Sequence, residues 1–115
     1  MGRQHFPPAD FDADHVEVWL VAQRALREQQ TWQKSDGLLL EHFCRNAVAA
    51  RRARHEAQDC YDALKLGVLL KRCANAEAAM LAIARELLLT PASRRRAGVK
   101  PPGTAVEDEL AALIG

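Results

Sequence analysis

The sequence predicts an all-α protein, built as a helical hairpin with a long central helix plus a third helix. Three observations predict this fold class. Alanine and leucine abound, while aromatic residues make up only 5% of the 115 residues. Apolar residues recur at helical spacing over three segments, and no segment has the apolar–polar alternation of a half-buried strand. Because a core of such small side chains is thin, part of the stability is expected to come from self-association.

The N-terminal segment predicts a flexible arm, residues 1–13, followed by a first helix. Pro7 and Pro8 lie in the arm, which has no apolar periodicity. Asp14 and Glu17 have the spacing of a capping box, so the helix is expected to open there and to run to about Glu28. One face of this helix carries Val16, Trp19, Leu20, Gln23 and Leu26.

The central segment predicts one continuous helix over residues 36–64, opened by Ser35 or Asp36 as its N-cap. Such a helix spans roughly 40 Å at 1.5 Å per residue, which is more than a small domain covers. Its heptad-like stripe is therefore expected to face the first helix or a neighbouring copy of the chain. The predicted oligomer interface consists of Leu40, Phe43, Ala47, Ala50, Ala57 and Tyr61.

A third helix is expected after a break. Gly67 predicts the C-terminal stop of the long helix or of its extension. Asn75 then predicts the N-cap of the third helix. One apolar line of that helix contains Ala76, Met80, Ile83 and Leu87.

A sharp corner ends the third helix. Pro91 has no amide hydrogen, and its ring disfavours helical geometry at Thr90, so the helix is expected to stop there. Thr90 is a good N-cap and Pro91 a favoured first helical residue, which predicts a short helix or turn at once. Ser93 has the spacing to return a hydrogen bond to the cap.

The end of the chain, residues 99–115, predicts a linker and a tail after the helical domain of residues 14–98. The linker is marked by Pro101, Pro102 and Gly103. In the tail, Leu110, Leu113 and Ile114 follow three acids and predict a short amphipathic helix. These three residues are expected to dock on a partner protein, and the alternative is that the tail folds back on its own assembly.

Charge is distributed unevenly along the chain, although the net charge is only +1. Residues 65–100 carry eight basic and two acidic side chains, a net of +6, whereas residues 101–115 carry three acids and no base. A basic segment between acidic ends favours an anionic partner for one surface, and phosphate contacts need charge but no particular sequence. The predicted DNA-binding residues are Lys71, Arg72, Arg94, Arg95, Arg96 and Lys100.

Both basic groups can also have roles that involve no DNA. The later group can be a solvated face, or its arginine stems can cover apolar surface. An earlier basic group on the central helix can likewise be solvated. Its last member, Arg54, interrupts the apolar stripe and can pair with an acid across a subunit interface. This earlier group is Arg45, Arg51, Arg52 and Arg54.

Catalytic and metal-binding motifs are not found. The sequence contains no Gly-rich phosphate loop and no nucleophile in a recognisable motif. The set His42, Cys44, His55 and Cys60 matches no common zinc spacing, so no metal and no cofactor are expected. The three cysteines are expected to be reduced thiols. No apolar run is long enough for a membrane span or a signal peptide. The chain is therefore not expected to be an enzyme.

The order of these elements resembles one protein family. The stretch Leu89-Thr90-Pro91-Ala92-Ser93-Arg94, together with an aspartate-led helix carrying Asp36, Phe43 and Cys44, is similar to the small subunits of tailed-phage DNA-packaging terminases. The resemblance covers roughly residues 14–98. Three departures exist: Leu88 stands where the family often has glycine, Ala76 stands where it often has proline, and the loop after Gly67 looks short.

The resemblance implies a non-catalytic subunit that assembles into a homo-oligomeric ring. Such a ring engages double-stranded viral DNA and regulates a separate large subunit, which carries the ATPase and the nuclease, in the cytoplasm of the bacterial host. Two other functions stay open. A dimeric helical DNA-binding regulator needs base-reading residues at the start of a helix, and the stretch Asn75-Ala76-Glu77-Ala78 offers few. A helical interaction module needs no nucleic acid at all.

Overall fold

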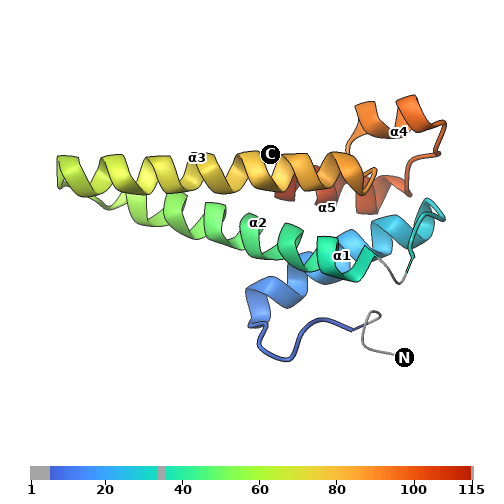
Figure 1. The fold of residues 1–115 in the computed structure, drawn as a ribbon, viewed down its shortest axis with the longest axis horizontal. Coiled ribbons are helices and arrows are strands. Elements are labelled where there is room, and N and C mark those ends of the chain that lie inside the picture. The colour runs from blue at the N-terminus through green and yellow to red at the C-terminus, as the bar shows by residue number, and fades with distance from the viewer. Residues whose placement is uncertain (1–5, 34–35, 115) are drawn as a thin grey trace.

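Five helices make up the protein in a computed structural model that describes residues 6–33 and 36–114 (Figure 1). They are α1 (Ala13–Glu28), α2 (Gly37–Gln58), α3 (Ala63–Glu86), α4 (Pro91–Ala97) and α5 (Thr104–Ile114). No strand occurs in the described ranges, so the predicted all-α class is confirmed. Ser35, one of the two predicted caps of the central helix, lies outside them. No helix of these ranges has the length and apolar character that a membrane crossing requires.

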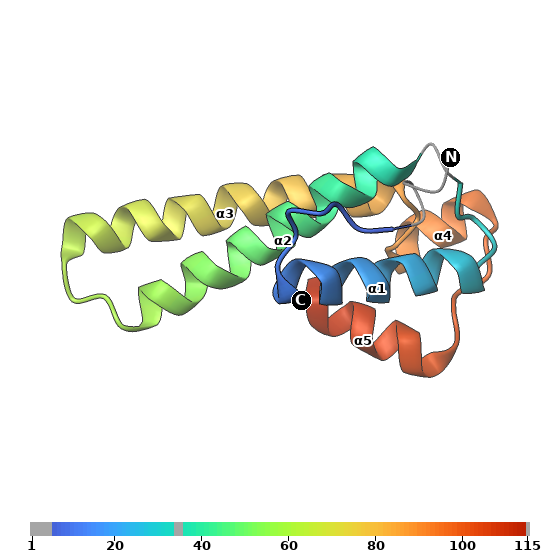
Figure 2. The ribbon, with the colours of Figure 1, turned by 90° about the horizontal axis from the view of Figure 1, so that it is seen from below.

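The predicted continuous helix over residues 36–64 is wrong, because the chain reverses between α2 and α3. The Asp62 carboxylate accepts the backbone N–H groups of Leu64 at 2.9 Å and Lys65 at 3.1 Å, which makes it the N-cap of α3. The two long helices form an antiparallel hairpin whose turn projects well beyond the other helices (Figures 1 and 2). A helical hairpin was predicted, but its long central helix was expected to pack against the first helix or a second copy rather than against α3.

The stop at Gly67 and the cap at Asn75 are also wrong, since both residues lie inside α3. A glycine in a helix interior costs only about 1 kcal/mol relative to alanine. The alanine-rich sequence that follows favours helix strongly enough to continue through both positions. No loop follows Gly67, which accounts for the short loop noted in the sequence.

Helix α1 begins two residues earlier than its predicted opening. Asp12 is the N-cap, and its Oδ1 accepts the N–H groups of Asp14 at 3.1 Å and His15 at 3.2 Å. The end of the helix at Glu28 is as predicted. There Gln30 takes a left-handed backbone with φ of 62°, and Thr31 donates its N–H to the Leu26 carbonyl at 2.9 Å. This pairing is the Schellman ending of a helix.

The core lies where α1, α5 and the two hairpin helices meet, at the end of the hairpin away from its turn. Its largest fully buried side chains are Trp19, Leu26, Leu40, Phe43, Leu89 and Leu110. Toward the turn the hairpin is held by a second, thin cluster of Ala50, Ala53, Cys73 and Ala76. Because these side chains are small, the outer half of the hairpin has little core of its own.

Most of the predicted oligomer interface is buried inside the single chain. Leu40 and Phe43 are fully buried, and Ala47 and Ala50 nearly so, because α3 folds back over them. The prediction is wrong for these four side chains. Ala57 is half-buried. Tyr61 is 99% exposed and stays available for another molecule.

The tail forms α5, which packs against α1 rather than standing free (Figure 2). Leu110 is buried, and Leu113 and Ile114 are half-buried against the core. The tail thus folds back on its own chain, and the predicted docking on a partner protein is wrong for Leu110, which that packing buries. Docking of the half-buried Leu113 and Ile114 stays a prediction. Glu28 fixes the approach, since its Oε1 accepts the N–H of Gly103 at 2.8 Å.

Candidate nucleic-acid interface at the α3–α4 corner

The end of α3 is built by a residue in a strained conformation. Leu88 has a φ of 61°, in the left-handed region where glycine is favoured. Leu89 donates its N–H to the Ala84 carbonyl at 2.8 Å, and Leu88 donates to the Arg85 carbonyl at 3.2 Å. These two bonds form a Schellman motif with leucine in the position of the usual glycine. The departure from the terminase pattern at Leu88 thus falls on the residue that bears the backbone strain.

Helix α4 opens with the predicted cap. Thr90 is extended, Pro91 is the first helical residue, and Thr90 Oγ1 accepts the Ser93 N–H at 3.2 Å. Ser93 Oγ donates to the Thr90 carbonyl at 2.9 Å and lies 2.7 Å from Thr90 Oγ1. These bonds satisfy the free donors and acceptors of the turn, so the corner has a defined geometry.

Arg94 is buried, although the sequence predicts it in the DNA-binding surface. Arg94 is only 2% exposed. Its Nε donates to the Leu88 carbonyl at 3.1 Å, one Nη donates to the Leu89 carbonyl at 3.1 Å, and the guanidinium pairs with Glu107 of α5. A phosphate cannot reach a guanidinium that is already enclosed and paired. The prediction is wrong for Arg94, which instead joins the end of α3 to α5.

A second polar side chain reaches the same place from α1. Gln29 Nε2 donates to the Leu88 carbonyl at 2.9 Å and to Thr31 Oγ1 at 3.0 Å. The Leu88 carbonyl therefore accepts from both Gln29 and Arg94. These bonds link α4 to α5 and to the ends of α1 and α3, although the buried Gln29 Oε1 has no hydrogen-bond partner among the described residues.

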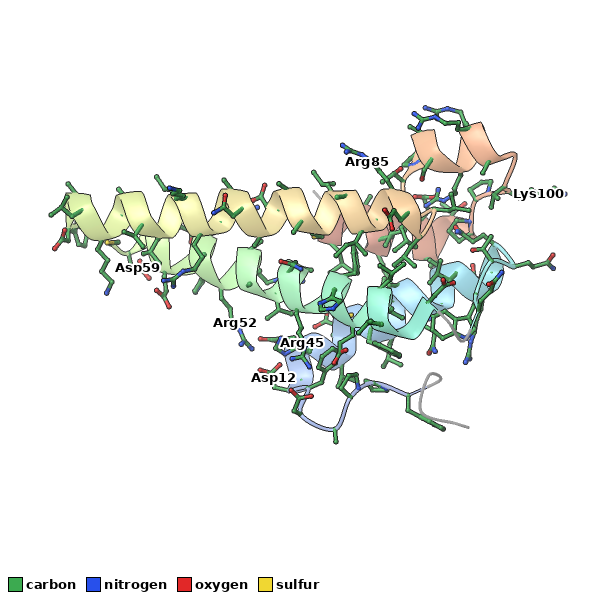
Figure 3. The ribbon with its side chains drawn as sticks, in the orientation of Figure 1. Asp12, Arg45, Arg52, Asp59, Arg85 and Lys100 are labelled. Carbon is green, nitrogen blue, oxygen red and sulfur yellow. The ribbon has the colours of Figure 1, made fainter. Side chains whose placement is uncertain are left out.

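The exposed charge of the corner comes from Arg95, Arg96 and Lys100, which the sequence predicted, and from Arg85, which it missed. Figure 3 shows Arg85 projecting from the side of α3 that carries α4, and Lys100 beyond the other end of α4. The one acid in residues 85–103 is Glu86. A signal for Arg85 existed, because it lies in the last turn of the helix that Pro91 terminates.

The end of α4 turns the chain back toward the core. Gly98 has a φ of 71°, and Val99 donates its N–H to the Arg94 carbonyl at 2.9 Å. Glycine adopts this conformation at little cost. The three arginines thus occupy one short helix that is capped at both ends, with only the first turned inward.

Lys71 and Arg72 do not join this surface. They lie on α3 fourteen and thirteen residues before Arg85, which places them about 20 Å along the helix at 1.5 Å per residue. Both are exposed. The six residues predicted to bind DNA therefore divide into the corner, the distant pair and the buried Arg94.

The earlier basic group is largely neutralised within the chain. Arg45 bonds to Asp10 and Glu41, and Arg52 bonds to Asp12 at 2.6 Å and Asp14 at 3.1 Å. Figure 3 shows Arg45 and Arg52 both directed from α2 toward Asp12 and the N-terminal segment. The remaining two members are Arg54, which pairs with Glu77 of α3 rather than across a subunit interface, and the exposed Arg51.

The described part of the chain has no group of three or more His, Cys, Asp or Glu side chains that could hold a metal ion. The thiols of Cys44 and Cys73 are buried, and burial is the main cause that raises the pKa of each. Comparison of the chain with protein-family models, curated proteins and solved structures gave no match.

Proposed function

We propose that the chain is a non-catalytic DNA-engaging subunit, of the kind found in the small subunits of viral DNA-packaging terminases. The observation that carries the proposal is the α3–α4 corner. It presents Arg85, Arg95, Arg96 and Lys100 to solvent from a rigid turn, with one acid nearby. Such a surface suits the phosphates of double-stranded DNA, which attract cations whatever the base sequence.

The rigid support of the corner favours a binding role. Arg94, Gln29 and the capped turn hold α4 in one position, so the exposed arginines lose little freedom on binding. Four cations on one copy make a weak site at physiological salt. A ring of copies repeats the site and adds the contacts by avidity. We therefore propose that the working form is a homo-oligomeric ring.

The resemblance to terminase small subunits supports the remaining parts of the proposal. They are engagement of viral DNA and regulation of a large subunit that carries the ATPase and the nuclease. The corner sequence Leu89 to Arg94 bears most of that resemblance. In this chain Thr90 is the cap of α4, Pro91 is its first helical residue, and Arg94 is buried and joins α4 to α3 and α5. These contacts orient the exposed basic residues that follow.

The experiment is a binding titration of fluorescein-labelled duplex DNA followed by anisotropy. The proposal expects binding that weakens steeply as salt is raised and that depends little on base sequence. A second titration adds the product of a large-terminase reading frame adjacent in the same genome, and a complex is expected. Absence of DNA binding at low salt contradicts the proposal and favours a helical interaction module.

A further inference from the structure

Exposed apolar side chains gather at the turn of the α2–α3 hairpin. Tyr61 is 99% exposed, Leu64 86% and Val68 57%. They lie within eight residues of one another, and Leu70, which is 53% exposed, follows them in α3. The other large exposed apolar side chains of the described residues are scattered as Phe6, Leu20 and Leu38. Single exposed apolar residues are ordinary, but a contiguous group marks a surface that another molecule covers. We name Tyr61, Leu64 and Val68 the tip surface.

The geometry of the tip surface suits a helix-to-helix contact. Leu64 and Val68 are four residues apart in α3, so their side chains lie one above the other on a single face. Tyr61 precedes them in the turn. Figures 1 and 2 show the turn standing clear of α1, α4 and α5 in both views. No other helix of the described residues is placed to cover it.

The charges around the tip surface are balanced and unpaired. Three acids lie at the end of α2 and in the turn, and three bases lie on the first turns of α3. None of the six makes an ion pair with any described residue. They are Glu56, Asp59, Asp62, Lys65, Lys71 and Arg72. Figure 3 shows Asp59 at this end of the hairpin.

We infer that the tip surface is covered by the tip surface of a second copy of this chain. A surface that carries equal numbers of both charges beside an apolar strip is complementary to itself, as contact between identical patches requires. DNA and anionic membranes bind surfaces that carry bases and few acids. The three acids at the tip therefore disfavour both as partners. The inference rests on the self-association part of the proposed function. A contact between identical surfaces joins copies in pairs, and the proposed ring needs a separate head-to-tail contact in addition.

The apolar side chains of the tip surface are too small to make a stable contact alone. A stable interface takes about 800 Å² from each partner, and a fully exposed tyrosine supplies about 200 Å² of it. The tip therefore needs the flanking charged side chains, whose stems add to the contact. It also explains why the outer half of the hairpin persists with a core of small residues only, since a second copy shields it.

The test is the mass of the protein in solution, measured by size-exclusion chromatography with light scattering at tens of micromolar. Because the tip contact pairs copies, the wild type is expected to contain an even number of copies, and L64S/V68S is expected at half the wild-type mass. For a wild-type dimer that half is the monomer mass of 12.8 kDa. The matched control L38S changes an exposed leucine of α2 outside the tip and is expected to stay assembled. Circular dichroism reports whether each variant keeps its helices.

Charge reversal gives a second test that does not depend on the apolar residues. K71E/R72E is expected to fall to half the wild-type mass, and adding E56K/D59K to the same chain is expected to restore the full mass. Restoration supports contact between copies, because a different partner has no reason to be rescued.

Two results overturn the inference in distinguishable ways. A monomeric wild type contradicts both the inference and the proposed ring, while DNA binding by that monomer still supports the corner. An assembled wild type whose L64S/V68S variant keeps the full wild-type mass contradicts the tip surface alone.

Discussion

Arg94 of α4 and Glu107 of α5 form a bidentate ion pair, with Nη1 2.5 Å from Oε2 and Nη2 3.2 Å from Oε1. The Arg94 side chain is buried, and Glu107 is half-buried. The same guanidinium donates to two carbonyls at the end of α3. One side chain therefore joins three helices, and the residue that the sequence places in a run of three arginines has a structural role unlike that of its neighbours.

Replacing Arg94 is expected to destabilise the fold. In R94A the carboxylate of Glu107 and the two carbonyls lose their donors. Removing one partner of a buried pair costs about 3–5 kcal/mol, and the partial exposure of Glu107 favours the lower value. A loss of about 3 kcal/mol lowers the melting temperature by roughly 10 °C. Thermal unfolding of R95A, which removes an exposed arginine, is the control and is expected to match the wild type. Equal melting temperatures for R94A and R95A contradict the tether.

Because the backbone at Leu88 is left-handed, a glycine variant is expected to be more stable there than an alanine variant, the reverse of the usual order in a helix. Both L88A and L88G lose the Leu88 side chain beyond Cβ, so their difference reports the effect of a Cβ on the left-handed backbone. A non-glycine residue there costs about 1–2 kcal/mol, and L88G is expected to be more stable than L88A by about 1 kcal/mol. At Ala78, exposed in the middle of α3, A78G is expected to destabilise by about 1 kcal/mol. Chemical denaturation of these three variants and the wild type measures both differences, and L88A more stable than L88G refutes the strained turn.

Asp12 is expected to titrate well below an ordinary aspartate. The hydrogen bond from Arg52 is the main cause that lowers its pKa from the usual value of 3.8, and bonds from His15 add to it. Since the folded pKa is below the unfolded one, the contact stabilises the fold above about pH 4 and loses that contribution as the pH falls toward the folded pKa. Carbon-detected NMR of the Asp12 carboxyl is expected to give a midpoint below 3.8, rising in R52A. An unchanged midpoint in R52A excludes Arg52 as the cause.

The thiols are expected to react in a fixed order. Cys60 is half-buried near the hairpin turn, whereas Cys44 and Cys73 are buried. Burial raises the pKa of both buried thiols, and a hydrogen bond to Glu77 adds to the rise for Cys73. Labelling of the native protein with a thiol-disulfide reagent is expected to show one fast thiol, which is absent in C60S. Two fast thiols in the wild type contradict the packing of the hairpin.

Local signals predicted the parts of the fold that local chemistry decides. Thr90 and Pro91 define the corner through capping and a missing amide hydrogen, and these effects need no tertiary partner. The reversal between α2 and α3 was missed because its residues contain no glycine or proline. Asp62 was the available signal, as a side chain able to cap the next helix. The strain at Leu88 was visible only as a departure from the family's glycine.

Tertiary contacts decide the rest of the site. Nothing in the run Arg94-Arg95-Arg96 distinguishes its first member, because the partner Glu107 lies thirteen residues away in another helix. The stripe on the central segment was read as an interface between copies because the returning α3 was not foreseen. The apolar face of the tail was likewise assigned to a partner protein, when α1 was near enough to cover it.

The salt dependence of duplex DNA binding tests the central claim most directly. The logarithm of the binding constant falls with the logarithm of salt by about 0.9 for each phosphate contact. R95A/R96A is therefore expected to bind more weakly and with a slope shallower by about 1.8, while R51A, an exposed arginine of α2 away from the corner, keeps the wild-type slope. Slopes that agree among the wild type, R95A/R96A and R51A contradict the claim that the α3–α4 corner engages DNA.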